Sequence, residues 1–424
     1  MSENPREIAV EVLLETGKAA FVEDLLARKL ETARLASADR GLCQELVYGV
    51  VRWQAALDWL AAQKTRRAPE QPALRVLLRL GLYQIFWLDR VPDHAAVHET
   101  VQAARRRGLV SQAGFINAVL RNCLRDAESL RAGLSRLETQ EPWIAYSHPE
   151  WLARRWQSRY GPEPAAALMR WNNAPPPTFA RVNTLKTEPG ALLETWRAEG
   201  VEYDFARRDW FEENLVFELK AYPRLDTLPS FQRGWFYIQD PSTLLAVHEL
   251  APKPGETILD LCAAPGGKLT FIAQQTRNEG KLLARDVDPE RLKRVTENCE
   301  RLGAVCEQSG AASSASCDRI LVDAPCSNTG VIRRRVDLRW RIKPEEITRL
   351  RGVQLDLLNQ AGPLLKSGGT LVYSTCSLEP EENGEVTRAF LASNPWFQLE
   401  AERELLPFQD QTDGAYVARL KKSA

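Results

Sequence analysis

The sequence of 424 residues predicts a multidomain protein, with an all-α bundle, a small α+β module and an α/β domain in that order. The chain is longer than one ordinary domain. Its first part carries apolar residues at helical spacing, and its last part alternates short apolar runs with helical stretches, which is typical of a parallel sheet with crossover helices. We place the three parts at residues 1–138, 142–240 and 241–424.

The composition limits the class of protein. The chain has 56 basic residues (Lys and Arg) and 56 acidic residues (Asp and Glu), so its formal net charge is zero. This excludes a uniformly basic nucleic-acid binder but allows local basic patches. The N-terminus does not resemble a secretory signal, and Arg75 and Arg79 interrupt the most apolar stretch, so we expect no membrane span. The 8 cysteines form neither a CxxC pair nor a cluster with histidine. We therefore expect free thiols, a cytoplasmic protein and no metal site.

The first part of the chain contains residues that are typical of helix starts and helix ends. Ile8, Val12 and Leu13 share one helical face, and Pro5 suits a first helical turn. The proline-rich stretch 67–73 breaks the helical pattern, and Gly108 after three arginines suits a helix end. These signals predict a compact helical bundle.

The middle part mixes both kinds of signal. The segments "LVFELK" and "GWFYIQD" alternate like strands, and "ALLETWRAEG" has a helical pattern. This mixture predicts the small α+β module.

The last part predicts four strands, "TILDL", "KLLARD", "DRILVD" and "GTLVYST", with helices between them. One helix is well delimited, because Asp288 is a suitable N-cap, Pro289 fits the first turn and Gly303 fits just past the end. Ligands of open α/β sheets bind beyond the carboxyl ends of the strands. The residues that follow those strand ends are therefore the candidates for ligand binding and catalysis.

A glycine loop, Pro265-Gly266-Gly267, follows the first of these strands and opens a helix. Glycines allow close approach of a ligand to the backbone, and a helix N-terminus offers free N–H groups. Asp286 lies about 20 residues further on, the spacing of an acid that binds ribose hydroxyls. The loop matches neither GxGxxG nor a P-loop, since Leu269 follows Lys268, and a tight structural turn is the alternative interpretation.

Two cysteines lie just after strand ends. Cys326 follows Asp323-Ala324-Pro325, and Cys376 follows "LVYST". Burial as a small apolar residue explains most lone cysteines. We expect that role for five of them, Cys43, Cys123, Cys299, Cys306 and Cys317. Cys326 and Cys376 stand in polar turns beside the glycine loop, which indicates a reactive site.

Three stretches together carry a family resemblance. "DLCAAPGGK", "DAPCSNTG" and "YSTCSLEPEEN" resemble motifs of the S-adenosylmethionine-dependent RNA cytosine-5 methyltransferases. The helical first part resembles the NusB-like RNA-binding domain of the bacterial RsmB (Sun, Fmu) family, which methylates one cytosine in 16S ribosomal RNA. The resemblance covers nearly the whole chain and implies an RRM-like middle module and a Rossmann-like catalytic domain.

The resemblance implies roles for the site residues. Cys376 would attack ring carbon 6 of cytosine, Cys326 would assist release, and Asp323 would bind the base edge and touch the cofactor. Asp286 would bind the ribose of S-adenosylmethionine. The rest of the cofactor cradle would be Cys262, Ala263, Ala264, Pro265, Gly266, Gly267 and Lys268. Ser309-Gly310 stand where the family usually places an acid near the adenine, which puts adenine binding in doubt.

Basic residues follow the Pro-Cys loop directly. Such residues beside a catalytic loop suit phosphates and an unstacked base, although a solvated charged turn is the alternative. The candidates are Arg333, Arg334, Arg335, Arg339 and Trp340. By resemblance, Arg181 and Asn183 would also position RNA.

We expect a monomer that acts on 16S ribosomal RNA. Two alternatives remain open, the same reaction on another RNA such as tRNA, and a non-catalytic, antitermination-like RNA-binding protein. The pair Cys326 and Cys376 argues against the second alternative, whereas the missing acid near Ser309 argues for it.

Overall fold

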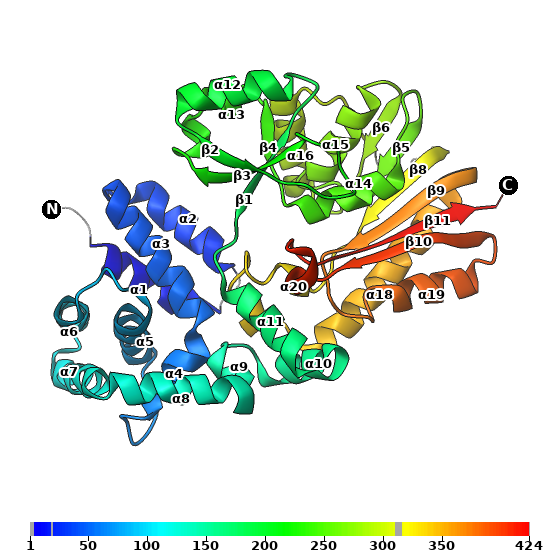
Figure 1. Ribbon diagram of the computed structural model, residues 1–424. Helices are drawn as coiled ribbons and strands as arrows, with labels where there is room; N and C mark the ends of the chain where they lie inside the picture. Colours follow the sequence, from blue (N-terminus) through cyan, green and yellow to red (C-terminus); the bar gives the residue numbers. More distant parts are fainter. Residues whose placement is uncertain (1–3, 18–19, 310–315, 424) are drawn as a thin grey trace. The chain divides into compact units, whose positions relative to one another are not determined.

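The computed structural model describes residues 4–17, 20–309 and 316–423 (Figure 1). Contacts divide the chain into two compact units. Unit 1 comprises Met1–Pro175 and Ile332–Ile342, and unit 2 comprises Pro176–Val331 and Lys343–Ala424. This division groups the strands of the predicted middle module with the α/β domain.

The described part of unit 1 is built of helices, as predicted. The Asn4 side chain caps the first helix by accepting a hydrogen bond from Arg6 N at 2.9 Å. Leu46, Leu57 and Leu77 are among the fully buried residues of one continuous apolar core. The helices are α1 (Pro5–Glu15), α2 (Val22–Thr32), α3 (Ser37–Arg52), α4 (Gln54–Ala62), α5 (Pro72–Trp87), α6 (Asp93–Arg106), α7 (Val110–Arg125), α8 (Ala127–Gln140), α9 (Pro142–Ala145), α10 (Glu150–Tyr160), α11 (Pro162–Asn173) and α17 (Leu338–Arg341).

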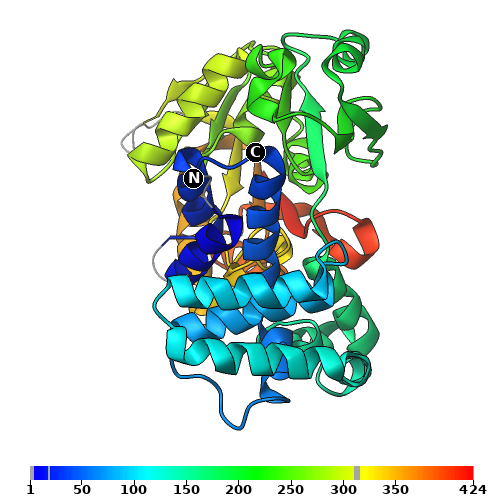
Figure 2. The same cartoon turned by 90° about the vertical axis from the view of Figure 1, so that its left-hand side faces the viewer.

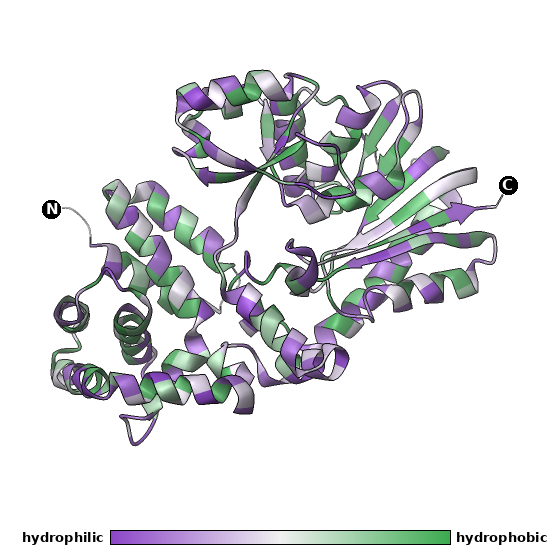
Figure 3. Cartoon of the chain, viewed as in Figure 1, coloured by the Kyte–Doolittle hydropathy of each residue, from purple (hydrophilic) through white to green (hydrophobic). Residues whose placement is uncertain are grey.

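The helices of unit 1 are amphipathic. Figure 3 shows both hydrophobic and hydrophilic residues along them, as expected for helices that bury one face. Helices α6 and α7 pack side by side, and the cyan helices of Figure 2 show this part of the bundle from a second direction. In the described part of the chain, no helix combines the length and the apolar character that a membrane crossing requires.

Unit 2 begins with a four-stranded antiparallel sheet in the order β2-β3-β1-β4. The Trp196 ring is fully buried and meets Phe217 and Phe236 edge-on, with ring centroids 5.7 and 5.2 Å away. The predicted α+β module is confirmed. Its elements are β1 (Thr178–Val182), α12 (Pro189–Glu199), β2 (Glu202–Phe205), β3 (Val216–Ala221), η1 (Leu225–Thr227), α13 (Pro229–Gln232) and β4 (Phe236–Ile238).

A second sheet carries the α/β domain, and its described strands run in the order β10-β11-β9-β8-β5-β6-β7. The strands from β9 to β7 are parallel, whereas β11 pairs antiparallel with β9 and with β10. The strands are β5 (Thr257–Asp260), β6 (Lys281–Ala284), β7 (Glu307–Gln308), β8 (Cys317–Asp323), β9 (Leu365–Thr375), β10 (Phe397–Leu405) and β11 (Ala415–Lys422).

All four predicted strands of this domain are present, as β5, β6, β8 and β9. The predicted helix ends are also confirmed, since α16 begins at Pro289, the Asp288 side chain accepts from Glu290 N at 2.9 Å, and Gly303 ends the helix at φ 71°. The helices are η2 (Pro241–Thr243), α14 (Leu244–Leu250), α15 (Gly267–Thr276), α16 (Pro289–Leu302), η3 (Thr329–Val331), α18 (Pro344–Ala361), η4 (Gly362–Leu364), α19 (Gly384–Ser393) and α20 (Pro407–Asp410).

Candidate active site

The glycine loop joins β5 to α15 and lies close to other backbone and side-chain atoms. Gly266 has φ 105°, a conformation that L side chains rarely adopt. A Cβ atom on Gly267 would lie 3.1 Å from Tyr237 Cε1 and 3.3 Å from Gln239 Nε2. The Arg181 guanidinium donates to the Gly267 carbonyl oxygen at 2.9 Å. The backbone conformation therefore favours glycine at position 266, and a side chain at position 267 would have to displace Tyr237 or Gln239 slightly. The buried Arg181 guanidinium holds the loop in place.

Asp286 lies at the end of the neighbouring strand, as predicted, and faces the glycine loop. Its carboxylate is 2% exposed. One oxygen accepts from Ala264 N and the other from Asp288 N, both at 3.2 Å. In this structure the carboxylate stabilises the glycine loop by its hydrogen bond from Ala264 N. Binding of the ribose hydroxyls by Asp286 stays a prediction.

Asp260 is an acid of this site that our sequence reasoning missed. It ends β5, is 1% exposed, and its Oδ1 atom has no hydrogen-bond partner. Burial and the neighbouring Asp323 carboxylate raise the pKa of Asp260 to about 8. Its position directly before the loop was the signal that could have identified it. A buried acid with an unpaired oxygen fits a hydrogen-bonding ligand group, and a cationic group would favour its ionised form.

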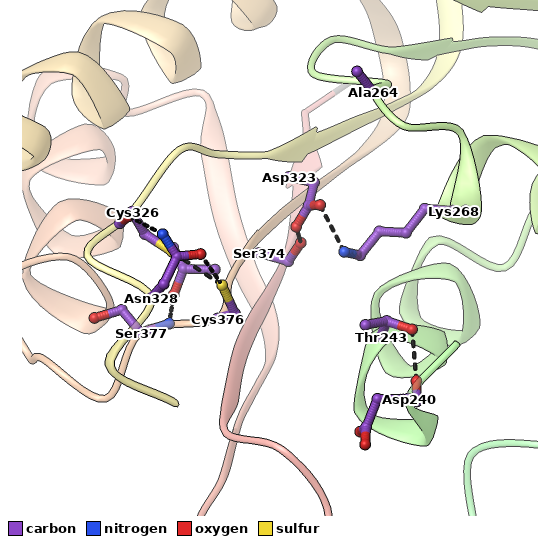
Figure 4. A network of polar contacts seen from close by, with 12 residues as sticks. Asp240, Thr243, Ala264, Lys268, Asp323, Cys326, Asn328, Ser374, Cys376 and Ser377 are labelled. Carbon is purple, nitrogen blue, oxygen red and sulfur yellow. Dashed lines mark hydrogen bonds and ion pairs between the residues drawn. The ribbon is translucent and has the colours of Figure 1, made fainter. Parts of the chain in front are cut away.

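The two predicted cysteines come together. The Sγ atoms of Cys326 and Cys376 lie 3.3 Å apart, on the loops that follow the paired strands β8 and β9 (Figure 4). Asn328 joins both loops, because Cys376 Sγ donates to its Oδ1 at 2.9 Å and its Nδ2 donates to the Cys326 carbonyl at 2.7 Å. The contact with Cys376 and burial raise the pKa of the Cys326 thiol well above its usual value.

Asp323 lies between the thiol pair and the glycine loop (Figure 4). Its carboxylate accepts from Lys268 Nζ at 2.6 Å and from Ser374 Oγ at 2.8 Å. Burial lowers the pKa of Lys268, but Asp323, together with Cys376 and Asp260, raises it more, so the net shift is upward. The pair is therefore an ion pair, with an ammonium at the start of α15 and a carboxylate at the end of β8.

The predicted gap in the adenine site falls partly outside the described residues, because Gly310 lies there. Ser309 is described and continues the edge of the sheet, with its N–H donating to the Ala284 carbonyl at 2.8 Å. Its hydroxyl accepts from the Arg285 side chain at 3.3 Å. In the described part of the chain, this position carries a neutral side chain.

Four of the five cysteines that were predicted to be buried are buried in the structure. Cys43, Cys123, Cys299 and Cys317 are buried, as predicted. Cys306 is only half-buried, and its Sγ atom lies 3.6 Å from that of Cys299. Cys306 therefore departs from the expectation, because it stands at the exposed start of the edge strand β7. In the described residues, no group of His, Cys, Asp and Glu side chains could hold a metal ion.

The predicted RNA contacts of Arg339 and Arg333 need correction, whereas that of the half-buried Trp340 stays a prediction. The Arg339 side chain is fully buried inside unit 1 and donates to the Arg52, Ser147 and Asn172 carbonyls and to Asn173 Oδ1. Arg333 is 2% exposed and stacks on the Trp171 ring, and Trp340 Nε1 donates to the Val51 carbonyl. Burial within unit 1 therefore leaves the Arg339 and Arg333 side chains without a surface for RNA.

Arg181 and Asn183 are buried as well. The Arg181 guanidinium holds the glycine loop and also donates to Gln239 and Thr270. The Asn183 amide donates to the Gly234 and Leu302 carbonyls, both at 2.7 Å. Both residues therefore join the four-stranded sheet to the α/β domain instead of offering groups to RNA.

Arg335 and Arg334 differ from these buried residues. Arg335 is exposed and Arg334 half-exposed. An RNA contact by either residue stays a prediction.

The strand order, the glycine loop, the buried acids and the thiol pair define the class of S-adenosylmethionine-dependent methyltransferases. Three family descriptions match successive parts of the chain: NusB family over residues 3–125, an RsmF/B-like ferredoxin-like domain over 148–217, and 16S rRNA methyltransferase RsmB/F over 247–421. The chain belongs to the RsmB/F methyltransferase family.

Full-length relatives agree with this assignment. The chain is 36% identical over 449 residues to the probable ribosomal RNA small subunit methyltransferase B of Bacillus subtilis. The match covers 98% of each chain. It is also 36% identical over 431 residues to ribosomal RNA small subunit methyltransferase B of Escherichia coli, with 98% of this chain and 97% of that protein covered. The crystal structure of PH0851 superposes with a TM-score of 0.79 at 25% identity over the whole of both chains.

The site fits the cofactor of its class. S-adenosylmethionine carries an ammonium group and a positive sulfonium centre. The free Oδ1 atom of Asp260 is a suitable partner for a cation, and the bare backbone at Gly266 and Gly267 allows close approach. The loop from Cys262 to Lys268 is therefore the expected cradle.

Proposed function

We propose that this protein methylates carbon 5 of a cytosine in 16S ribosomal RNA through a covalent adduct with Cys376. The observation that carries the proposal is the thiol pair, in which two sulfur atoms lie 3.3 Å apart beside the cofactor loop. A methyl transfer to nitrogen or oxygen needs no thiol, whereas carbon 5 of cytosine is a poor nucleophile until a group adds to carbon 6.

Cys376 is the nucleophile in this proposal. Its thiolate adds to carbon 6 and makes carbon 5 electron-rich. Its half-exposed position supports this role, because Cys326 is more deeply buried. Asn328 Oδ1 lies 2.9 Å from the Cys376 sulfur and accepts a hydrogen bond from its S–H group. When bound, S-adenosylmethionine supplies the methyl group as an electrophile.

Cys326 is the base that completes the reaction. After methyl transfer, it removes the proton from carbon 5, and the Cys376–carbon 6 bond breaks. Cys326 can do so only as a thiolate, and its raised pKa makes that thiolate a strong base once its own proton has left. Its distance from Cys376 suits two thiols that act on adjacent ring atoms of one base.

Asp323 and Lys268 orient the base. Lys268 and Ser374 hold one carboxylate oxygen of Asp323 each, so the carboxylate has a fixed direction at the strand end. We propose that it binds the base edge near ring nitrogen 3 and stabilises the adduct. The target base must leave its stack to reach this site.

The RNA target is inferred from the relatives, whose names specify the small ribosomal subunit. Methylation of another RNA, such as tRNA, would use the same site residues. The non-catalytic alternative is disfavoured by the intact thiol pair. Bisulfite mapping of RNA from cells with and without the gene distinguishes the targets, since only the true substrate loses a methylated cytosine.

The decisive experiment is tritium transfer from S-adenosylmethionine to unmethylated 16S RNA, followed by a denaturing gel. Wild type should incorporate label, Cys376→Ala should incorporate none, and Cys326→Ala should leave a slow-migrating protein–RNA adduct. Cys317→Ala, at a buried cysteine at the start of β8, is the matched control. Full activity of Cys376→Ala would refute the assigned roles.

A further inference from the structure

One buried carboxylate accepts hydrogen bonds from both cysteine loops. Glu382 is fully buried, between β9 and α19. Its Oε1 accepts from the backbone N–H of Ser327 at 2.8 Å, and its Oε2 accepts from the hydroxyls of Ser327 and Ser377. Ser327 directly follows Cys326, and Ser377 directly follows Cys376. Each catalytic loop is therefore bound to the same carboxylate one residue from its sulfur.

Helix α18 strengthens this arrangement. Gln354 is fully buried and its amide group donates to Glu382 Oε1 at 3.1 Å and to the Pro325 carbonyl at 2.9 Å. Burial raises the pKa of Glu382, while the hydroxyl, amide and backbone donors around it oppose that shift. A buried polar group that is satisfied by several donors is rigid, because each lost contact would leave a buried group unpaired.

Other side-chain contacts also join the two loops. Asn328 bonds to both of them, Leu378 N donates to Thr329 Oγ1 at 2.8 Å, and the Ser327 and Ser377 hydroxyls lie 3.0 Å apart. The β8–β9 ladder ends at the pair Asp323 and Ser374, before either cysteine. Beyond that pair, main-chain hydrogen bonds run from Ala324 N to the Ser374 carbonyl and from Gly330 N to the Cys376 carbonyl, both at 2.9 Å. Side chains must therefore supply much of the order around the thiols.

We propose that Glu382 is a positioning residue that sets the distance between Cys326 and Cys376. This inference rests on the proposed function for its catalytic consequence, but the geometric claim stands apart from it. The two thiols act on adjacent atoms of one base, so a shift of about 1 Å between them lowers the transfer rate by about 10²-fold. The Glu382 carboxylate itself touches neither base nor cofactor in this scheme.

Three variants distinguish the positioning role of Glu382 from a general effect on protein stability. Glu382→Ala removes every acceptor and leaves the donors of both loops buried. Glu382→Gln keeps an oxygen for the Ser327 N–H and the Gln354 amide, and its own amide can donate to the serine hydroxyls, so it should rescue. Glu385→Gln is the control, because Glu385 lies three residues on and has only a loose ion pair with Arg351 at 3.8 Å.

The spacing is measured without any methyl transfer. Dibromobimane bridges two nearby thiols when each thiolate displaces one bromide, and peptide mapping identifies the bridged pair. The Cys299–Cys306 pair, with sulfur atoms 3.6 Å apart, is an internal standard within the same unit. Glu382→Ala should lose most of the Cys326–Cys376 bridge and keep the Cys299–Cys306 bridge, whereas Glu382→Gln and Glu385→Gln should keep both.

Kinetics provide the second measurement. Glu382→Ala should lower kcat by about 10²-fold with little change in KM for S-adenosylmethionine, because the cofactor loop is unaltered. If Glu382→Ala does not fold, Ser377→Ala is the alternative. It removes one hydrogen bond to Glu382 and should lower the yield of the Cys326–Cys376 cross-link several-fold. An unchanged Cys326–Cys376 bridge in a folded Glu382→Ala or Ser377→Ala protein overturns the proposal. If wild type transferred no methyl group but Glu382→Ala still lost the Cys326–Cys376 cross-link, the positioning role of Glu382 would stand. Only the proposed function would then be refuted.

Discussion

The sulfur atoms of Cys326 and Cys376 lie 3.3 Å apart although the residues are 50 positions apart in the sequence. Parallel pairing of β8 with β9 explains this, since Asp323 lies opposite Ser374 and both strands end at the same edge of the sheet. Each loop then extends a short way past that edge. The distance suits two thiols that act on neighbouring atoms, and several consequences are testable.

Asn328→Gly should slow methyl transfer without weakening cofactor binding. The change removes the contacts with the Cys376 sulfur and the Cys326 carbonyl, while glycine adopts the φ of 58° easily. Loss of the contact with the Cys376 sulfur alone costs about 1–1.5 kcal/mol, or about ten-fold in rate. Single-turnover transfer measures the effect. Asn214→Gly, at an exposed position with φ 62°, is the control and should leave the rate unchanged.

Asp260 should make stability depend on pH in an unusual direction. With a pKa of about 8 in the folded state and an ordinary pKa near 4 when unfolded, the folded protein holds an extra proton between these values. The contribution of Asp260 to the free energy of unfolding therefore falls as pH rises from about 4 to about 8. Urea unfolding at a series of pH values should show a smaller fall for Asp260→Asn. Equal slopes in both proteins would contradict the assignment.

Gly266→Ala should destabilise the cofactor loop. Alanine at φ 105° is strained, which costs about 1–3 kcal/mol. The Kd for S-adenosylmethionine should rise together with this loss, as measured by titration calorimetry. Gly190→Ala tests the specificity of the effect, because Gly190 lies in α12 with nothing near its missing Cβ, and a neutral or stabilising outcome is expected there.

Arg339→Met should destabilise the protein strongly. The change leaves four buried oxygen acceptors without their donor, which predicts a loss of about 3–5 kcal/mol in urea unfolding. Arg335→Met, four residues earlier on an exposed position, should stay within about 0.5 kcal/mol. Equal stability of the two variants would restore Arg339 as a candidate for RNA contact.

Local signals sufficed for most of the fold. The helix from Pro289 to Leu302 was delimited correctly because its cap, its proline and its final glycine are all local in sequence. The strands of the α/β domain were found from short apolar runs. The thiol pair was also predictable, since carboxyl ends of neighbouring parallel strands meet at one edge.

The basic segment after the Pro-Cys loop shows where such reasoning fails. Arg339 reads as a surface residue, because arginine is rarely buried without a carboxylate. In the structure, main-chain and amide oxygens from three distant parts of unit 1 surround it. Burial lowers its pKa to about 9, a consequence of packing that no local pattern carries.

The sequence by itself determined the order of helices and strands, the glycine loop and the placement of Cys326 and Cys376 at strand ends, because these depend on periodicity and on residues close in the chain. Tertiary structure alone decided the free oxygen of Asp260, the burial of Arg339 and the bridging position of Glu382. These features depend on which distant groups share a low-dielectric interior, where an unpaired donor or charge is costly and every polar partner must be supplied by packing.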